Sequence, residues 1–408
     1  MRSATPGRVA SLDLIRGVAV LGILAINIAG FAGPSAASLS PGAILPAEPL
    51  DEAAFAFGFL LFEGKMRALF TILFGASMML FIENAETRGE DGDLLQFRRL
   101  CWLMVLGQLH YFALWWGDIL FAYAACGMIA LMLRQMSIGA MLTVALAVFV
   151  STHALAGLEA WPSIAAEEAV RQGSAALEQS RAHAGYLATI DRMAARELAL
   201  YQSDFMAIAG DKLRENPFWL LEMTWGNIGE TLPLTLVGAA LHRSGFFAGQ
   251  WPRRVMLGVA VGATLVGLLV TLAALAWAWP REFPIVAMNA LLRTFLALPH
   301  FVTALGYAAI LVLATRRITS LPLGRWIADA GRMALSNYIA TSLIMTAFFY
   351  GWGLGLFGTV GGAWQWAFVL GGWATMLVFS HFWLARFRRG PLEWVWRSLT
   401  ERRILANH

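Results

Sequence analysis

The sequence predicts an all-α protein, a polytopic membrane helical bundle, and three observations lead to this prediction. Hydrophobic residues make up 59% of the 408 residues and charged residues only 14%, a balance too apolar for one soluble core. Apolar runs of about 20 residues, the length of a helix that crosses ~30 Å of hydrocarbon, recur along the chain. Arginines gather in every second loop between these runs, as they do in multi-pass membrane proteins.

The apolar runs predict about ten transmembrane helices. With the N-terminus placed in the cytoplasm, the short outer loops hold only Arg281, whereas the inner loops are rich in arginine. Because positively charged loops resist translocation, we expect a multi-pass protein of the bacterial cytoplasmic (inner) membrane with both termini inside. The predicted spans are 12–33, 55–82, 100–116, 119–133, 138–158, 218–241, 255–279, 285–314, 331–350 and 364–384.

Composition divides the chain into three predicted parts. Residues 1–158 form an N-terminal membrane half of about five spans, and residues 218–408 form a C-terminal membrane half of about five spans with a basic, aromatic tail. Between them, residues 159–217 mix Ala, Leu, Glu and Arg, which favours amphipathic helices in an external cap. The simpler interpretation of this cap is a solvated cover without chemistry.

The charge and the cysteines exclude several classes of function. A net charge of +4 would suit a nucleic-acid partner in a soluble protein, but here the arginines report orientation, so we expect the lipid bilayer and no nucleic acid as partner. Cys101 and Cys126 lie in or beside apolar runs without metal-ligand spacing, so neither a disulfide framework nor a metal site is expected. The sequence also lacks a P-loop, a dinucleotide fingerprint and a serine nucleophile elbow.

The first span, RVASLDLIRGVAVLGILAINIAG, carries three polar residues that are costly beside lipid. Arg16 and Asn27 are eleven residues apart, which returns to within about 20° of the same helix face and advances ~16 Å. Asp13, three residues before Arg16, can pair with it. The guanidinium could hold an anionic group such as a phosphate, or it could simply snorkel while Asn27 bonds a neighbouring helix.

The second run, 55–82, is too long for one plain span and includes Glu63, Lys65 and Arg67. Three ionisable residues in five imply a break that faces protein or water. We expect a re-entrant outer segment over residues 55–65, followed by the true span, with Glu63 and Arg67 paired at i and i+4.

Two histidines lie near the middle of predicted spans. His110 is the best candidate for a general base, because burial favours the neutral, proton-accepting imidazole, and Asp118 follows it at a tight outer turn. His300 is a second candidate, and for either one a purely interhelical hydrogen bond is an equal alternative. Glu222 and Glu230 could share one face of the sixth span as proton carriers.

Several stretches together resemble the YeiB family of bacterial multi-pass membrane proteins. They are SLDLIRGVAVLGILAIN, KMRALFTILFGASMML, GQLH with GDILFAYAACG, and GRMALSNYIATSLIMTAFFYGWGLGLFG followed by ARFRRGPLEWVWRSLT. The resemblance covers nearly the whole chain, and the stretch around Asn337 is one of its most specific parts. The C-terminal half of this family is catalogued only as a domain of unknown function, so the resemblance implies a fold more firmly than an activity.

The first span is also similar to that of transmembrane acyltransferases, including the lysosomal heparan glucosaminide acetyltransferase. Many of these have Arg, ten residues and then His, and the glucosaminide type has Asn there, as Arg16 and Asn27 do here. The similarity implies acyl-CoA phosphates near Arg16 and transfer to an acceptor on the outer side. The chain departs from that type in having no His in the loop 34–52, so His110 is the expected base.

Two functional hypotheses from different classes follow. In the first, acyl-CoA such as acetyl-CoA donates to a glycan, lipid or small-molecule acceptor, with His110, Asn27 and Asp118 in the catalytic centre. Substrate would be bound by Arg16, Asp13, Glu63, Lys65, Arg67, His300 and Asn337. In the second, the same intramembrane charges form the path of a proton-coupled transporter or exporter. A non-catalytic scaffold is a third alternative.

Overall fold

The structure, a computed structural model, describes residues 10–43 and 45–408, and the described part is helical without strands. The helices are α1 Ala10–Ala32, α2 Pro49–Leu61, α3 Lys65–Glu86, α4 Gly92–Ala113, α5 Leu120–Leu133, α6 Ile138–Arg171, α7 Leu177–Tyr201, α8 Phe205–Arg214, α9 Trp219–Arg243, α10 Arg253–Gly258, α11 Thr264–Ala278, α12 Ile285–Ala290, α13 Ala297–Ser320, α14 Pro322–Arg332, α15 Ala334–Phe349, α16 Gly362–Arg386 and α17 Pro391–Glu401. Short 3₁₀ segments are η1 Ser35–Ser38 and η3 Trp279–Arg281, and π-helical segments are η2 Val259–Ala263 and η4 Leu291–Phe295.

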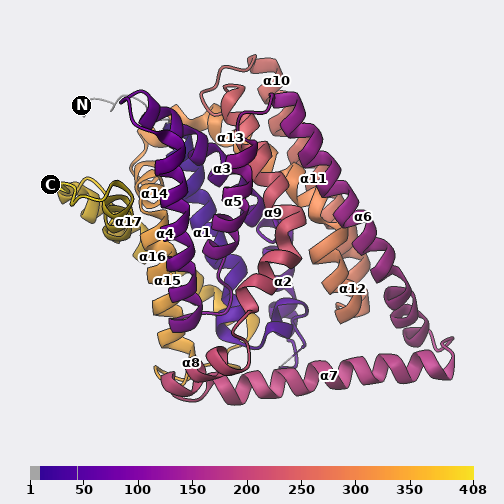
Figure 1. Cartoon of the computed structure of the whole chain (residues 1–408). Helices are drawn as coiled ribbons and strands as arrows, with labels where there is room; N and C mark the ends of the chain where they lie inside the picture. The colour runs from indigo at the N-terminus through magenta and orange to yellow at the C-terminus, as the bar shows by residue number, and fades with distance from the viewer. Residues whose placement is uncertain (1–9, 44) are drawn as a thin grey trace.

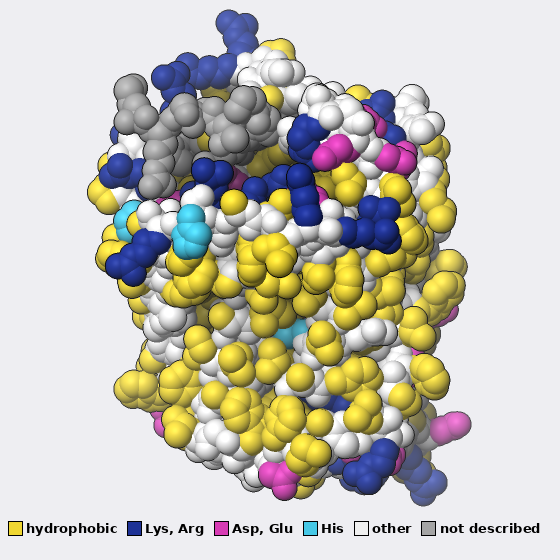
Figure 2. Space-filling view, turned by 60° about the vertical axis from the view of Figure 1, so that its left-hand side comes forward, with side chains coloured by type: hydrophobic (Ala, Val, Ile, Leu, Met, Phe, Trp, Pro, Cys, Tyr) yellow, Lys and Arg dark blue, Asp and Glu magenta, His cyan; other side chains and the backbone are white. Residues whose placement is uncertain are grey.

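Six of the described helical stretches are long and apolar enough to cross a membrane: Ala10–Ala32, Pro49–Glu86, Ile138–Arg171, Arg253–Arg281, Ala297–Ser320 and Gly362–Arg386. Shorter apolar helices, Leu120–Leu133, Ile285–Phe295 and Ala334–Phe349, lie in the same bundle. Figure 2 shows a broad hydrophobic belt around the middle of the molecule with charged side chains gathered toward its two ends. This pattern is that of a helical membrane bundle, which confirms the predicted fold class.

Glycines allow the central helices to cross at close range. At Gly17 of α1 an added Cβ would lie 1.9 Å from the Ile327 carbonyl oxygen of α14, and at Gly331 of α14 it would lie 1.9 Å from the Asp13 carbonyl oxygen. Gly75 of α3 and Gly238 of α9 face each other's helix in the same reciprocal way. Small residues let backbones approach where lipid supplies no hydrophobic drive between helices. These two crossings fix α1 and α3 in the middle of the bundle.

Helices α7 and α8 close one end of the bundle, which we call the cap end, and α10, α14 and α17 lie toward the other, which we call the tail end (Figure 1). α7 runs across the cap end and is tied to the bundle by Glu197, whose carboxylate accepts from the Ser35 backbone N–H at 2.6 Å and hydroxyl at 2.9 Å. The Gly351 backbone N–H donates to the Tyr201 carbonyl at 2.8 Å. Of the predicted cap, 159–217, residues up to Arg171 continue α6, and α7 and α8 form the helices at the cap end.

The predicted break in the second run is present. α2 ends at Leu61 and α3 begins at Lys65, with Gly64 between them at φ +68°, a conformation that glycine adopts without strain. A second break, which the sequence did not predict, divides the run 285–314 at η4 and Leu296. The predicted span 138–158 is too short, because α6 continues to Arg171 and holds Pro162 within it.

Candidate functional site

A buried chain of three polar side chains joins α4, the α4–α5 turn and α15. The His110 Nδ1 atom lies 2.8 Å from Asp118 Oδ2, and its Nε2 atom lies 2.8 Å from Ser342 Oγ. His110 is 2% exposed, Ser342 1% and Asp118 0%. The sequence predicted His110 and Asp118 as one centre, and the structure brings them together and adds a hydroxyl on the far side of the imidazole.

Local geometry holds the carboxylate in place. Asp118 Oδ1 accepts from the Phe121 backbone N–H at 2.9 Å, at the start of α5, where unpaired amides and the helix dipole favour a negative charge. An added Cβ at Gly107 would lie 2.8 Å from Asp118 Oδ1 and 2.6 Å from the Phe121 nitrogen, so glycine is what lets α4 approach this turn. The GQLH and GDIL stretches thus place the acid directly against the histidine.

The order carboxylate, imidazole, hydroxyl is the arrangement that activates a serine. A carboxylate only accepts hydrogen bonds, so it holds the proton on His110 Nδ1 and leaves the Nε2 lone pair facing the Ser342 hydroxyl. Such a group can remove the hydroxyl proton and return it to a leaving atom. Constellations of this kind are recognised by geometry and not by order in the chain.

Ser342 is the candidate site residue that the sequence analysis did not single out. It lies in SNYIATSLIMT, where several hydroxyl side chains bond back to their own helix, and Ser342 Oγ is also 3.2 Å from the Tyr338 carbonyl. Nothing local distinguishes it from Thr346, which bonds to the Ser342 carbonyl at 2.7 Å. The only signal was indirect: a buried His and Asp need a third polar partner, and α15 supplies several hydroxyls.

A small cavity beside Ser342 is lined by Asn27 and Tyr338. Its volume is about 10 Å³, roughly the space of one water molecule. The Tyr338 hydroxyl donates to the Gly117 carbonyl at 3.2 Å, and the Tyr338 ring lies 5.0 Å from that of His110. In the described part of the chain the Asn27 amide has no hydrogen-bond partner, so its donors remain available to a ligand. The cavity therefore places Asn27 beside Ser342, the hydroxyl partner of His110.

A second polar group lies at the other end of the Arg16–Asn27 stripe. Arg16 donates to Asp13 at 3.4 Å, the pair that the spacing predicted, and to Ser77 Oγ of α3 at 2.7 Å. Arg99 of α4 lies within electrostatic range of both Arg16 and Arg397 of α17, and its guanidinium stacks 4.1 Å over the Trp396 ring. Three guanidiniums from α1, α4 and α17 thus share one region, and Arg99 and Arg397 were not predicted as part of it.

A third cluster surrounds the α2–α3 break, and here one expected pairing is wrong. Arg67 pairs with Glu230 of α9 at 3.2 Å and not with Glu63, whose carboxylate accepts from the Gly64 backbone N–H at 3.1 Å. Glu63 belongs to the turn, and the helix that holds Arg67 starts only at Lys65, so the two never share an i, i+4 face. Lys65, fully buried, donates to the carbonyls of Phe59 and Glu63 at 3.1 and 3.2 Å.

His300 lies against this break without a hydrogen-bond partner. It is 1% exposed, and neither ring nitrogen has a partner among the described residues. An added Cβ at Gly64 would lie 1.8 Å from His300 Nδ1, so the ring fills the space that glycine leaves. Glu222 and Glu230 do not share a face either, because Glu222 is exposed whereas Glu230 is 8% exposed.

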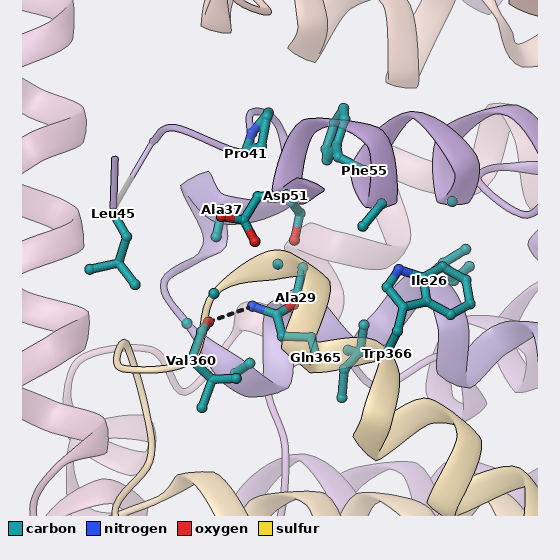
Figure 3. A pocket seen from close by; sticks show the side chains of 18 of the residues that line it. Ile26, Ala29, Ala37, Pro41, Leu45, Asp51, Phe55, Val360, Gln365 and Trp366 are labelled. Atoms are coloured by element: carbon teal, nitrogen blue, oxygen red, sulfur yellow. Dashed lines mark hydrogen bonds between the residues drawn. The ribbon is translucent and has the colours of Figure 1, made fainter. Parts of the chain in front are cut away.

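A pocket of about 110 Å³ that opens to the surface is lined by α1, the loop after it, α2 and the start of α16. Figure 3 shows Asp51 and Gln365 turned toward it, with the Gln365 amide donating to the Val360 carbonyl at 3.1 Å. Asp51 Oδ1 accepts from the Ala363 backbone N–H at 2.8 Å. Glu63 also lines this pocket, so it connects the surface to the α2–α3 break. Over residues 10–43 and 45–408, no group of His, Cys, Asp and Glu is placed to hold a metal ion.

The predicted substrate residue Asn337 lies on α15, one turn and a half before Ser342. Its amide donates to the Ala330 carbonyl at 3.1 Å and to Ser380 Oγ at 2.9 Å. Its side chain also borders a groove between α15 and α16, described below. Asn337 is thus separate from the His110 centre, although both Asn337 and Ser342 lie on α15.

The fold and these sites define a polytopic helical membrane protein with a buried Asp–His–Ser chain. A family model described as "Protein of unknown function (DUF418)" matches residues 241–403. The chain is similar to the uncharacterized protein YeiB of Escherichia coli (strain K12), with 32% identity covering 96% of each chain. It is also similar to the uncharacterized protein YxaH of Bacillus subtilis (strain 168), with 30% identity covering 97% of this chain and 95% of the relative. The chain therefore belongs to the YeiB family. No solved structure matches it.

Proposed function

We propose that the protein is a membrane-embedded acyltransferase that works through the Asp118–His110–Ser342 chain. The single observation that carries the proposal is a serine hydroxyl 2.8 Å from an imidazole whose other nitrogen is held by a buried carboxylate. A structural hydrogen-bond network needs no such order of groups, and a serine nucleophile does. The membership of the family supports a membrane protein of this architecture, and the chemistry rests on the site.

The reaction has two steps with one proton held by His110. In the first, Ser342 Oγ attacks the thioester carbonyl of acyl-CoA, His110 Nε2 takes the hydroxyl proton, and the thiolate of CoA leaves with that proton. In the second, an acceptor hydroxyl or amine attacks the serine ester, His110 takes its proton and returns it to Ser342 Oγ. Asp118 holds the imidazole and stabilises its charged form.

Asn27 is assigned the role of stabilising the oxyanion that forms when Ser342 attacks the carbonyl. Its amide has free donors and lines the cavity beside Ser342, where the carbonyl oxygen would gain negative charge. Losing one donor of this kind typically slows catalysis about 10²–10³-fold.

The guanidiniums of Arg16, Arg99 and Arg397 are assigned to the phosphates of the donor. Arg16 lies about 16 Å from Asn27 along α1, a distance that the extended arm of CoA can bridge. Side chains of α1 between the two sites are buried, with Ile23 5% and Leu24 1% exposed, so the arm enters only when α1 separates from its neighbours. This assignment requires the orientation that the sequence predicts. In the inner membrane, the tail end would face the cytoplasm and the cap end would face outward.

The acceptor is assigned to the cap end, where the pocket lined by Asp51, Glu63 and Gln365 opens. Carboxylates and an amide around a shallow opening suit the hydroxyls of a glycan, a lipid headgroup or a small metabolite.

Trapping the acyl-enzyme tests the proposal. Purified protein in nanodiscs is given labelled acyl-CoA without acceptor, digested, and its peptides are analysed by mass spectrometry. We expect the acyl mass on Ser342, its loss in Ser342→Ala and its accumulation in wild type. Ser151→Ala is the matched control, because Ser151 also bonds back to its own helix, to the Val148 carbonyl at 3.2 Å, but faces outward from α6. Acyl transfer at the full rate in Ser342→Ala would show that Ser342 is not the nucleophile.

A second candidate function, a proton-coupled transporter, is favoured by one observation. The Arg67–Glu230 pair and the unpartnered His300 lie together at the α2–α3 break, where ionisable groups in a membrane often mark a path for ions or protons. Uptake into proteoliposomes that depends on a proton gradient and is abolished by Glu230→Gln, with no CoA binding, would select this function over acyl transfer.

A further inference from the structure

A groove of about 520 Å³ lies between α15 and α16 on the outside of the bundle. None of the assignments above uses it. Its lining is almost entirely apolar: Asn337, Ala340, Thr341, Ile344, Met345, Phe348, Ala367, Phe368, Gly371, Gly372, Thr375, Met376 and Phe379.

Small residues keep the groove open toward the hydrocarbon. An added Cβ at Gly371 would meet nothing within 4 Å, so this position is bordered by space and not by a packed neighbour. Ile344 and Phe379, 36% and 39% exposed, flank the opening. Because α16 is long and apolar enough to cross a membrane, hydrocarbon is what would reach the groove laterally.

The groove reaches the catalytic centre. Thr341 and Met376 line both the groove and the small cavity that holds Asn27 and Ser342. Thr341 directly precedes Ser342, and its hydroxyl has no hydrogen-bond partner among the described residues. A ligand that fills the groove therefore meets a free hydroxyl at the point where it approaches Ser342.

The other polar side chains of the lining already make hydrogen bonds within the protein. The Asn337 amide donates to Ala330 and Ser380, and the Thr375 hydroxyl donates to the Gly371 carbonyl at 2.9 Å. The groove extends along α15 from residue 337 to 348, which corresponds to ~16 Å, close to the ~15 Å depth of hydrocarbon in one leaflet. The lining thus suits a long, unbranched apolar chain and offers a headgroup no donor besides the Thr341 hydroxyl.

We infer that the α15–α16 groove holds a long fatty acyl chain, the tail of the acyl group that Ser342 accepts from the donor. This inference rests on the proposed function and gives it a substrate class: long-chain acyl donors and not acetyl-CoA. The chain lies in the groove, its carbonyl passes Thr341, and the serine ester forms at Ser342 with the tail still exposed to the bilayer.

Photolabelling tests the groove separately from the chemistry. Wild-type protein in nanodiscs is incubated with a palmitoyl-type CoA that carries a diazirine in its tail, irradiated and mapped by mass spectrometry. We expect labels on peptides containing Ile344 or Phe368 and their loss in Gly371→Leu, which fills the groove without a clash. Gly226→Leu is the matched control, because Gly226 is an exposed helical glycine on α9 with nothing within 4 Å of an added Cβ.

Rates add a second readout. The rate of palmitoyl transfer should fall at least about tenfold in Gly371→Leu, because displacing two methylenes from the groove weakens binding by about that factor. The rate in Gly226→Leu should stay unchanged. Labelling of the groove without acyl transfer from any donor would support the groove as a site for an acyl chain, but it would contradict the proposed acyltransferase activity. Transfer of acetyl and palmitoyl at equal rates in both variants, with labels spread evenly over the lipid-facing helices, would overturn the groove and leave the acyltransferase standing.

Discussion

His110 and His300 are both buried histidines in predicted spans, yet their surroundings are opposite. Both nitrogens of His110 are paired at 2.8 Å, with Asp118 on one side and Ser342 on the other. Neither nitrogen of His300 is paired within the described residues, and the ring presses against Gly64. Burial alone therefore says little about a histidine. Its partners distinguish the two: His110 is held between an acid and a hydroxyl, whereas His300 has no partner among the described residues.

The largest effect should come from breaking the better-connected histidine at its carboxylate. We expect Asp118→Asn to lower acyl transfer about 10³–10⁴-fold, because the amide no longer fixes the tautomer that leaves Nε2 free. Initial rates with saturating acyl-CoA measure this. His300→Ala is the matched variant and should change the rate by less than about tenfold. Equal losses in the two variants would erase the distinction between the histidines.

Replacing each histidine by leucine should separate them in stability. His110→Leu leaves a buried carboxylate and a hydroxyl unpaired and should destabilise the fold by about 3 kcal/mol. His300→Leu removes two unpaired nitrogens from an apolar site, so its cost should be within about 1 kcal/mol of zero or become a gain. Thermal unfolding in one detergent, followed by a thiol-reactive or intrinsic fluorescence signal, gives both values. A His300→Leu protein as unstable as His110→Leu would mean that His300 has a partner after all.

The contact between His300 and Gly64 can also be tested by a substitution at Gly64. Gly64→Ala places a Cβ at φ +68° and 1.8 Å from His300 Nδ1, and should cost about 2 kcal/mol of stability. In a His300→Ala background the steric part disappears and only the backbone strain remains, so the cost should be clearly smaller. A double-mutant cycle measures the difference. Additive costs would show that the ring does not press on the turn.

The smallest effect concerns the cap over His110. Lys212 of α8 is 3% exposed, and burial lowers its pKa to about 7 while its ammonium donates to the Tyr111 carbonyl at 2.7 Å. Between pH 7 and the ordinary lysine value near 10.5, the undocked cap binds more protons than the docked one. Docking should therefore strengthen as pH rises through this window, seen as slower hydrogen exchange in α8 after correction for the intrinsic rate. Lys212→Met should abolish the dependence.

Apolar run length and arginine placement were enough to predict the bundle, because each is a property of one segment facing lipid. The break at Gly64 was predictable as well, since Glu63, Lys65 and Arg67 cannot all face hydrocarbon. The break at Leu296 was not predicted, although η4 places Arg293 within an otherwise apolar run.

The site was predictable only where its residues are near in sequence. His110 and Asp118 are eight residues apart on either side of one turn, which made both of them candidates for one centre, and the structure adds their hydrogen bond. Ser342 is 232 residues from His110, and one hydroxyl among several on α15 carries no mark that identifies it. The same reason explains the wrong Glu63–Arg67 pair: local spacing suggested a partner, and α9 supplied Glu230 from 163 residues away.

α17 is fastened to the start of α15 by the Glu393 carboxylate and by the Ser336 hydroxyl, which accepts from the Leu392 backbone N–H at 3.0 Å. Glu393 accepts from the Leu335 and Ser336 backbone N–H groups at 2.8 and 3.1 Å and from the Ser336 hydroxyl at 2.5 Å, and burial raises the pKa of its carboxyl. The helix that it holds also carries Ser342, and α17 carries Arg397. Because Ser336 and Ser342 lie on one helix, less than two turns apart, α17 holds the end of α15 from which the Ser342 hydroxyl is positioned.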